Sequence, residues 1–138
     1  MGLNSAVLRR TFDVVMERQP MLMHRFYEIL FDRHPEAKAL FGRRSQVAQE
    51  KMLTEALVAV LDHIEDAAWL TDTLKSLGAK HVSYGVTDEM YTWVGGSLLA
   101  ALGEAAGPHW NDEAKAAWGE AYDAIAGLMK SGASASAS

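Results

Sequence analysis

The sequence predicts an all-α protein that folds as one domain. Apolar residues recur at helical spacing along most of the 138 residues, and no segment alternates apolar and polar residues for the length of a strand. No Asn-Gly or Asp-Gly dipeptide marks a hairpin turn. A chain of 15.1 kDa with 49% hydrophobic residues can bury one core but has no room for a second catalytic domain.

The clearest helical pattern lies in the middle of the chain. Its apolar residues, separated by steps of three and four with adjacent pairs, are Leu53, Ala56, Leu57, Val60, Leu61 and Ile64. Similar patterns run through residues 23–31, 91–102 and 114–128. Each segment is therefore predicted to be a helix with one face in the core, and the whole chain to contain six or seven helices.

Capping and breaking residues indicate where these helices begin and end. Pro20 and Pro35 can each open a helix, because the first turn does not use the missing backbone N–H. Asn111 can cap the last helix, and Ser45 is a weaker candidate to cap the central one. The Gly-Pro pair at 107–108 separates the last two long helices.

Charge and cysteine content exclude several classes of protein. A formal net charge of −5 with scattered Lys and Arg argues against a nucleic-acid partner. The absence of Cys excludes disulfides and thiolate metal sites. Neither a signal peptide nor a membrane span is recognised, so a cytoplasmic protein is expected. Residues 1–130 are predicted to form the domain, and residues 131–138 a disordered Gly/Ala/Ser tail.

One histidine is unusually placed. The segment 69–84 is amphipathic, and His81 shares its apolar face with Leu70, Leu74, Leu77 and Tyr84. A buried histidine with both nitrogens hydrogen-bonded is one interpretation, and a metal ligand is the other. No second His, Asp or Glu lies on this face at one-turn spacing, so a multi-histidine site is disfavoured.

A single axial histidine is sufficient for haem, because the porphyrin supplies the equatorial nitrogens. Haem also needs a flat apolar slot, and the Phe-rich segment 26–41 can form one wall of it. Ordinary core packing is the alternative explanation for that segment.

The order and spacing of several motifs resemble the globin family, in particular bacterial single-domain haemoglobins and the globin domain of flavohaemoglobins. The motifs are FYEILFDRHPEAKALF at 26–41, Lys80-His81, YGV at 84–86, MYTWVG at 90–95 and AWGEAY at 117–122. The resemblance extends from about the second helix to Ile125 and implies a globin fold around haem b.

On the proximal side, the resemblance implies that His81 binds the iron and that Phe41 packs against the porphyrin. Donation from His81 to the Leu77 carbonyl is expected to fix the ring. Tyr91 matches a proximal tyrosine of flavohaemoglobins, but their partner glutamate has no counterpart, because its register falls near residue 133. This departure favours ligand binding over peroxidase-like activation. Lys80 is a candidate partner for a haem propionate, with a solvated lysine as the alternative.

On the distal side, Tyr27 and Gln49 are the polar residues that the resemblance implies, with Leu53 over the haem face. Gln46 is the alternative to Gln49, because the preceding loop varies in length among relatives. Val86 and Val94, from the motifs that follow His81, complete the expected cofactor-binding set.

Three functions remain open at this level. The leading expectation is reversible dioxygen binding for storage, delivery or scavenging, with dioxygen and other diatomic gases as ligands. The enzymatic alternative is nitric oxide dioxygenation with an external reductase, because the flavohaemoglobin reductase domain is absent from these residues. A gas sensor or a cofactor-free helical module is the third possibility, so whether the chain is an enzyme stays open.

Overall fold

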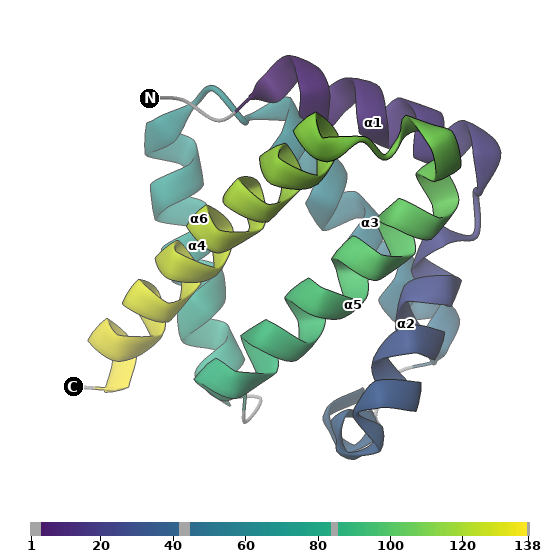
Figure 1. Cartoon of the computed structure of the whole chain (residues 1–138). Coiled ribbons are helices and arrows are strands. Elements are labelled where there is room, and N and C mark those ends of the chain that lie inside the picture. The colour runs from purple at the N-terminus through teal and green to yellow at the C-terminus, as the bar shows by residue number, and fades with distance from the viewer. Residues whose placement is uncertain (1–3, 42–44, 84–85, 138) are drawn as a thin grey trace.

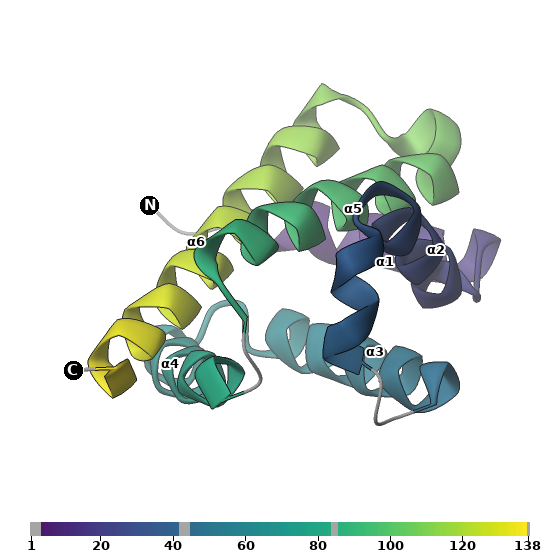
Figure 2. The same ribbon diagram turned by 90° about the horizontal axis from the view of Figure 1, so that it is seen from below.

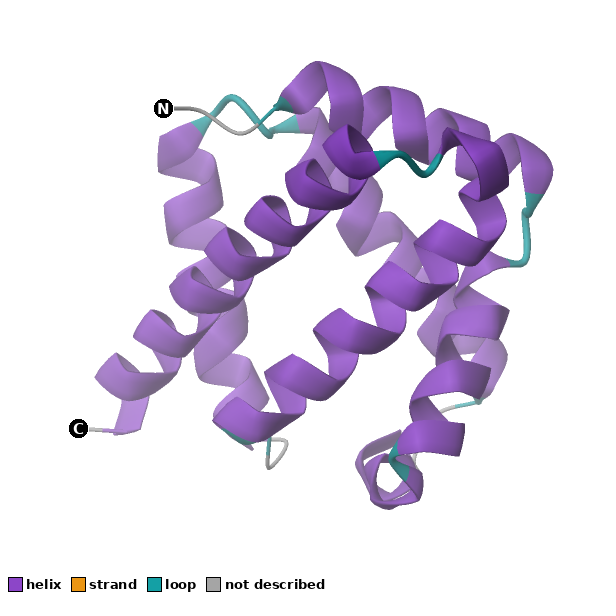
Figure 3. Cartoon of the chain, viewed as in Figure 1, coloured by secondary structure: helices purple, strands orange, loops and turns teal. Residues whose placement is uncertain are grey.

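The computed structural model describes residues 4–41, 45–83 and 86–137, and within these ranges every element is helical (Figure 3). The elements are α1 (Ser5–Arg18), α2 (Leu22–Arg33), the 3₁₀ helix η1 (Pro35–Phe41), α3 (Gln46–Asp62), α4 (Ala67–Ser83), α5 (Asp88–Ala106), the 3₁₀ helix η2 (Gly107–His109) and α6 (Asp112–Ala137). The all-α prediction is confirmed.

Two of the predicted helix caps are present. The Asn111 Oδ1 accepts a hydrogen bond from the Ala114 backbone N–H at 2.8 Å, and the Ser45 Oγ accepts one from the Ala48 N–H at 3.2 Å. Each cap satisfies a backbone donor that the first helical turn leaves unpaired. The beginnings of α6 and α3 therefore follow from local sequence.

Proline and glycine act at the other predicted boundaries. Pro35 is the first residue of η1, whereas the helix after Pro20 begins two residues later, at Leu22. Gly107 has φ +56°, a left-handed conformation that glycine adopts without a steric penalty. This residue ends α5 and lets the chain turn into η2 and then α6.

The helices form two crossing layers. Figures 1 and 2 show α5 and α6 running antiparallel in one layer, with α3 and α4 lying below them. α1 contacts α3, α5 and α6, and α2 contacts α3 and α5. The side chains that are almost completely excluded from solvent include Leu8, Val15, Leu22, Phe26, Leu30 and Leu102. Burial of these groups from separate helices provides the main stabilisation.

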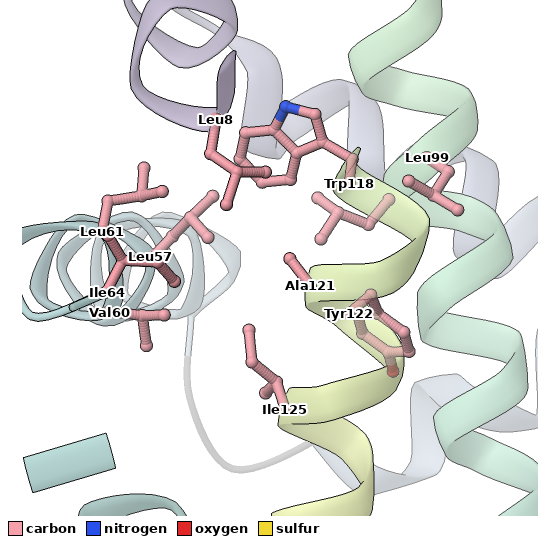
Figure 4. A pocket seen from close by; sticks show the side chains of 11 residues that line it. Leu8, Leu57, Val60, Leu61, Ile64, Leu99, Trp118, Ala121, Tyr122 and Ile125 are labelled. Atoms are coloured by element: carbon pink, nitrogen blue, oxygen red, sulfur yellow. The ribbon is translucent and has the colours of Figure 1, made fainter. Parts of the chain in front are cut away.

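A small cavity interrupts this core between α1, α3, α5 and α6. Its volume is about 20 Å³, and Figure 4 shows Leu57 of α3 and Ile64, two residues after α3, facing Ala121 and Ile125 of α6 across it. Cavities with such apolar walls remain dry, because water finds no hydrogen-bond partners there.

The contact between α4 and α6 depends on two glycines. A Cβ at Gly78 of α4 would lie 1.9 Å from the Met129 carbonyl oxygen, and one at Gly132 of α6 would lie 2.0 Å from the Lys75 carbonyl oxygen. The two backbones therefore approach more closely than any side chain at these positions would allow. This packing fixes the part of α4 that immediately precedes His81.

The end of α6 differs from the sequence prediction. A disordered tail is expected from Ser131 to Ser138, but the structure continues α6 to Ala137, and Gly132 is buried. Packing of Gly132 against α4 and the high helix propensity of alanine both favour helix here. Ser138 lies outside the described residues.

None of the helices in the described ranges combines the length and apolar content that crossing a membrane requires.

We expect Gly78→Ala to destabilise the fold by about 1–3 kcal/mol, because its methyl group forces α4 away from the α6 backbone. Gly127→Ala is the matched control, since nothing lies within 4 Å of a Cβ at that helical position. The control should be neutral or stabilising by up to about 1 kcal/mol. Urea unfolding measures both, and equal stabilities of the two variants would contradict the close approach of α4 and α6.

Candidate functional site

His81 lies in the last turn of α4 and is partly buried. Its Nδ1 is 2.7 Å from the carbonyl oxygen of Leu77, one turn earlier. A carbonyl can only accept, so Nδ1 carries the proton, and in the neutral ring the lone pair is on Nε2. The hydrogen bond expected from the sequence is present, and it gives the tautomer that binds a metal through Nε2.

This imidazole does not belong to a cluster of metal ligands. Among residues 4–41, 45–83 and 86–137, no group of three or more His, Cys, Asp or Glu side chains is arranged to hold a metal ion. A single imidazole is too few donors for a zinc site, but it is the proximal donor that haem requires.

Tyr91 of α5 lies beside His81. Their ring centroids are 6.5 Å apart at an interplanar angle of 30°. Tyr91 is 7% exposed, and its hydroxyl has no hydrogen-bond partner among the described residues. The Lys130 ammonium of α6 lies over the Tyr91 ring, 5.7 Å from the centroid. No described carboxylate therefore binds the Tyr91 hydroxyl.

Tyr122 of α6 holds the backbone of Tyr91 in place. Its hydroxyl donates a hydrogen bond to the Tyr91 carbonyl oxygen at 2.5 Å. Gly95 permits this contact, because a Cβ there would lie 2.5 Å from the Tyr122 ring. Burial raises the pKa of both tyrosines, and the charge of Asp88 raises that of Tyr91 further.

Tyr27 lies on the buried face of α2. It is 4% exposed and packs edge-on against Phe26, with a ring-centroid distance of 4.9 Å, and also against Phe31. Burial and the negative charge of Glu50 raise the pKa of Tyr27 to about 12. The phenol therefore remains a hydrogen-bond donor throughout the neutral range.

Gln49 and Leu53 lie one turn apart on α3, and both are partly buried. The described residues include no hydrogen bond between the side chains of Gln49 and Tyr27. The acidic residue next to Gln49 is the one that acts on Tyr27, and the sequence analysis missed it. In the sequence, Glu50 is marked only by its position next to Gln49. Its effect on the pKa of Tyr27 depends on the packing of α3 against α2.

The remaining predicted residues fall into two groups. Val86 and Val94 are partly buried and pack against the core cluster, whereas Lys80 is exposed. Phe41 ends η1 and Gln46 begins α3, but their side chains lie outside the described part of the chain.

These residues fit a haem group by their donor chemistry and packing. His81 has the metal-binding tautomer, while Leu53, Leu77, Val86 and Val94 are apolar side chains that the protein covers only in part. An imidazole with an Nε2 lone pair and partly covered apolar side chains are the features that haem binding needs.

The family model described as Globin matches residues 24–129, and the chain belongs to the globin family. Membership of this family implies haem binding and diatomic gas ligands.

The sequence is 37% identical to a flavohemoprotein of Bacillus thuringiensis subsp. konkukian over 122 residues, which covers 87% of this chain and 30% of that protein. It is 35% identical to a flavohemoprotein of Rhodopirellula baltica over 129 residues, which covers 87% of this chain and 32% of that protein. The chain thus spans about a third of the length of these relatives.

The fold is similar to that of a bacterial globin from Campylobacter jejuni, with a TM-score of 0.79, 25% identity and 94% of each chain covered. It is also similar to an engineered carbene transferase from a candidate nitric oxide dioxygenase of Rhodothermus marinus. That comparison has a TM-score of 0.81 and 25% identity, and covers 94% of this chain and 90% of the other.

We expect stability to fall between about pH 10 and about pH 12, in part because of Tyr27. The unfolded phenol loses its proton near pH 10.0, whereas the folded one keeps it to about 12, so rising pH favours the unfolded state. One such group contributes a slope of about 1.4 kcal/mol per pH unit. Urea unfolding across this range should show a shallower decline for Tyr27→Phe, and parallel declines would contradict the burial of this hydroxyl.

Proposed function

We propose that this chain binds haem b through His81 and binds dioxygen reversibly on the opposite face of the haem, next to Tyr27 and Gln49. The observation that carries the proposal is the hydrogen bond from His81 Nδ1 to the Leu77 carbonyl, because it leaves the Nε2 lone pair as the metal donor. When bound, the haem iron supplies the coordination position for a diatomic gas.

The proximal residues favour ligand binding over activation of peroxide. A backbone carbonyl is the acceptor for His81 Nδ1, and a neutral acceptor increases imidazole basicity less than a carboxylate does. Tyr91 stands beside His81 with Lys130 over its ring and no carboxylate partner among the described residues. His81 is therefore proposed to hold the haem for ligand binding, with the Leu77 carbonyl as its hydrogen-bond acceptor.

The distal residues supply donors for a polarised ligand. The raised pKa of Tyr27 keeps its hydroxyl protonated, and the amide of Gln49 adds a neutral donor that cannot replace the gas as a metal ligand. Each such hydrogen bond is worth about 0.5–1.5 kcal/mol. Dioxygen is more polarised by ferrous iron than carbon monoxide is, so these donors favour dioxygen.

Nitric oxide dioxygenation is the second candidate function. The similarity to flavohemoproteins and to the Rhodothermus marinus protein supports it. In this reaction nitric oxide, dioxygen and one electron combine to give nitrate. The electron must come from a reductase, which is proposed here to be a separate partner or a domain beyond these residues. A cytoplasmic location fits that supply of electrons.

We expect His81→Ala to lose most of its haem on dialysis, because the hydrogen bond from His81 Nδ1 to the Leu77 carbonyl leaves Nε2 as the proposed iron donor. His109→Ala is the control, since His109 is exposed on η2 and should leave haem retention unchanged. Visible absorption spectra before and after dialysis measure the difference. An unaltered spectrum of His81→Ala would remove His81 as the ligand.

We expect Tyr27→Phe to accelerate dioxygen dissociation by about two- to tenfold, the kinetic equivalent of one lost hydrogen bond. Carbon monoxide dissociation serves as the internal control and should change much less. Stopped-flow displacement measures both rates. Equal effects on the two gases would mean that Tyr27 acts through packing and not through its hydroxyl.

A further inference from the structure

Lys130 of α6 differs from the other lysines of the chain. It is partly buried, whereas the other five are exposed. The exposed lysines are Lys38, Lys51, Lys75, Lys80 and Lys115. The Lys130 ammonium lies 5.7 Å from the centroid of the Tyr91 ring, within the distance at which an aromatic face attracts a cation. No described carboxylate forms an ion pair with this ammonium, so no neighbouring acid neutralises its charge.

Two separate contacts bring Lys130 close to His81. The Tyr91 ring that lies under the ammonium is also beside His81, with 6.5 Å between the two ring centroids. Met129, the residue before Lys130, packs against the backbone of Gly78 and leaves no room for a Cβ there. Gly78 is three residues before His81, which is about one turn of α4. The ammonium is thus carried by the part of α6 that touches α4 next to the proposed iron ligand.

A positive charge at this position affects the oxidation state of a haem that His81 holds. Ferric haem carries one more positive charge than ferrous haem, so a nearby cation disfavours the ferric form. Partial burial of Lys130 limits the screening by water and salt that weakens exposed charges. Asp88 brings a negative charge to Tyr91, but Asp88 is exposed in the first turn of α5 and is therefore screened more.

We propose that the Lys130 cation, held over the Tyr91 ring, raises the reduction potential of the haem and so favours the ferrous form, which binds dioxygen. This inference rests on the proposed function. Reduction adds one electron to ferric haem, and an external reductant supplies it. Lys130 changes the equilibrium and not the source of the electron. The alternative is that Lys130 only covers apolar surface with its aliphatic stem, and this alternative requires no effect of charge.

The test is a spectroelectrochemical titration of the haem-loaded chain. Lys130→Met and Lys130→Gln each remove the charge and keep a side chain of similar length. Both should lower the ratio of ferrous to ferric haem at a fixed potential by about two- to tenfold. For a one-electron couple, this equals a fall in reduction potential of about 18 to 59 mV. Lys130→Arg keeps the charge and should keep the potential of the parent protein.

Lys115→Met is the matched control. Lys115 is exposed on the same helix, fifteen residues before Lys130, which places it about 22 Å away along the axis. Its removal is the same change of charge and should leave the potential unchanged. The Tyr91 ring is tested in the same way. Tyr91→Phe keeps the ring and should preserve the effect of Lys130→Met, whereas Tyr91→Leu removes the ring and should reduce that effect.

The outcomes separate this proposal from the function on which it rests. If haem and dioxygen bind but the potential is the same with and without the charge at residue 130, the role of Lys130 is wrong and the function stands. An equal fall in Lys130→Arg or in Lys115→Met also overturns that role. So does loss of the effect in Tyr91→Phe, or an undiminished effect in Tyr91→Leu. A chain that binds no haem overturns the function, and the role of Lys130 with it.

Discussion

The site depends on one short hydrogen bond, from His81 Nδ1 to the carbonyl of Leu77 at 2.7 Å. The bond lies within a single helix, so it forms whenever α4 is helical at this point. It determines at the same time the tautomer and the direction of the ring. The position of α4 is then set by its contact with α6, where Gly78 and Gly132 allow the two backbones to approach. The hydrogen bond within α4 and the close crossing of α4 and α6 together orient the His81 imidazole.

Tyr91 and Tyr122 are the main aromatic residues near this donor. Tyr91 lies beside His81, but a lysine and not a carboxylate lies over its ring, and its buried hydroxyl has no partner among the described residues. Tyr122 instead restrains Tyr91 through the backbone. Tyr122 therefore positions the backbone of Tyr91, while the Tyr91 side chain has no carboxylate partner among the described residues.

The residues proposed for the distal side come from α2 and α3, which contact each other. The apolar face of α2 buries Tyr27, and its hydroxyl remains a donor because burial opposes ionisation. Glu50 of α3 raises the pKa of this hydroxyl by its charge, and its carboxylate contacts His24 of α2. The relative positions of Tyr27 and Glu50 therefore depend on how α2 and α3 cross. Small changes in that crossing would alter the direction of the Tyr27 donor.

The sequence by itself determined the local features. Helical periodicity, the caps at Ser45 and Asn111, and the bond from His81 to Leu77 each involve residues no more than four positions apart, so they follow from the geometry of one helix. Only the tertiary structure decided which helices touch. The packing of Gly132 on α4, the cation over Tyr91 and the contact of Glu50 with His24 join residues from different helices. Such contacts depend on crossing angles and side-chain volumes summed over the whole core, which no single segment encodes.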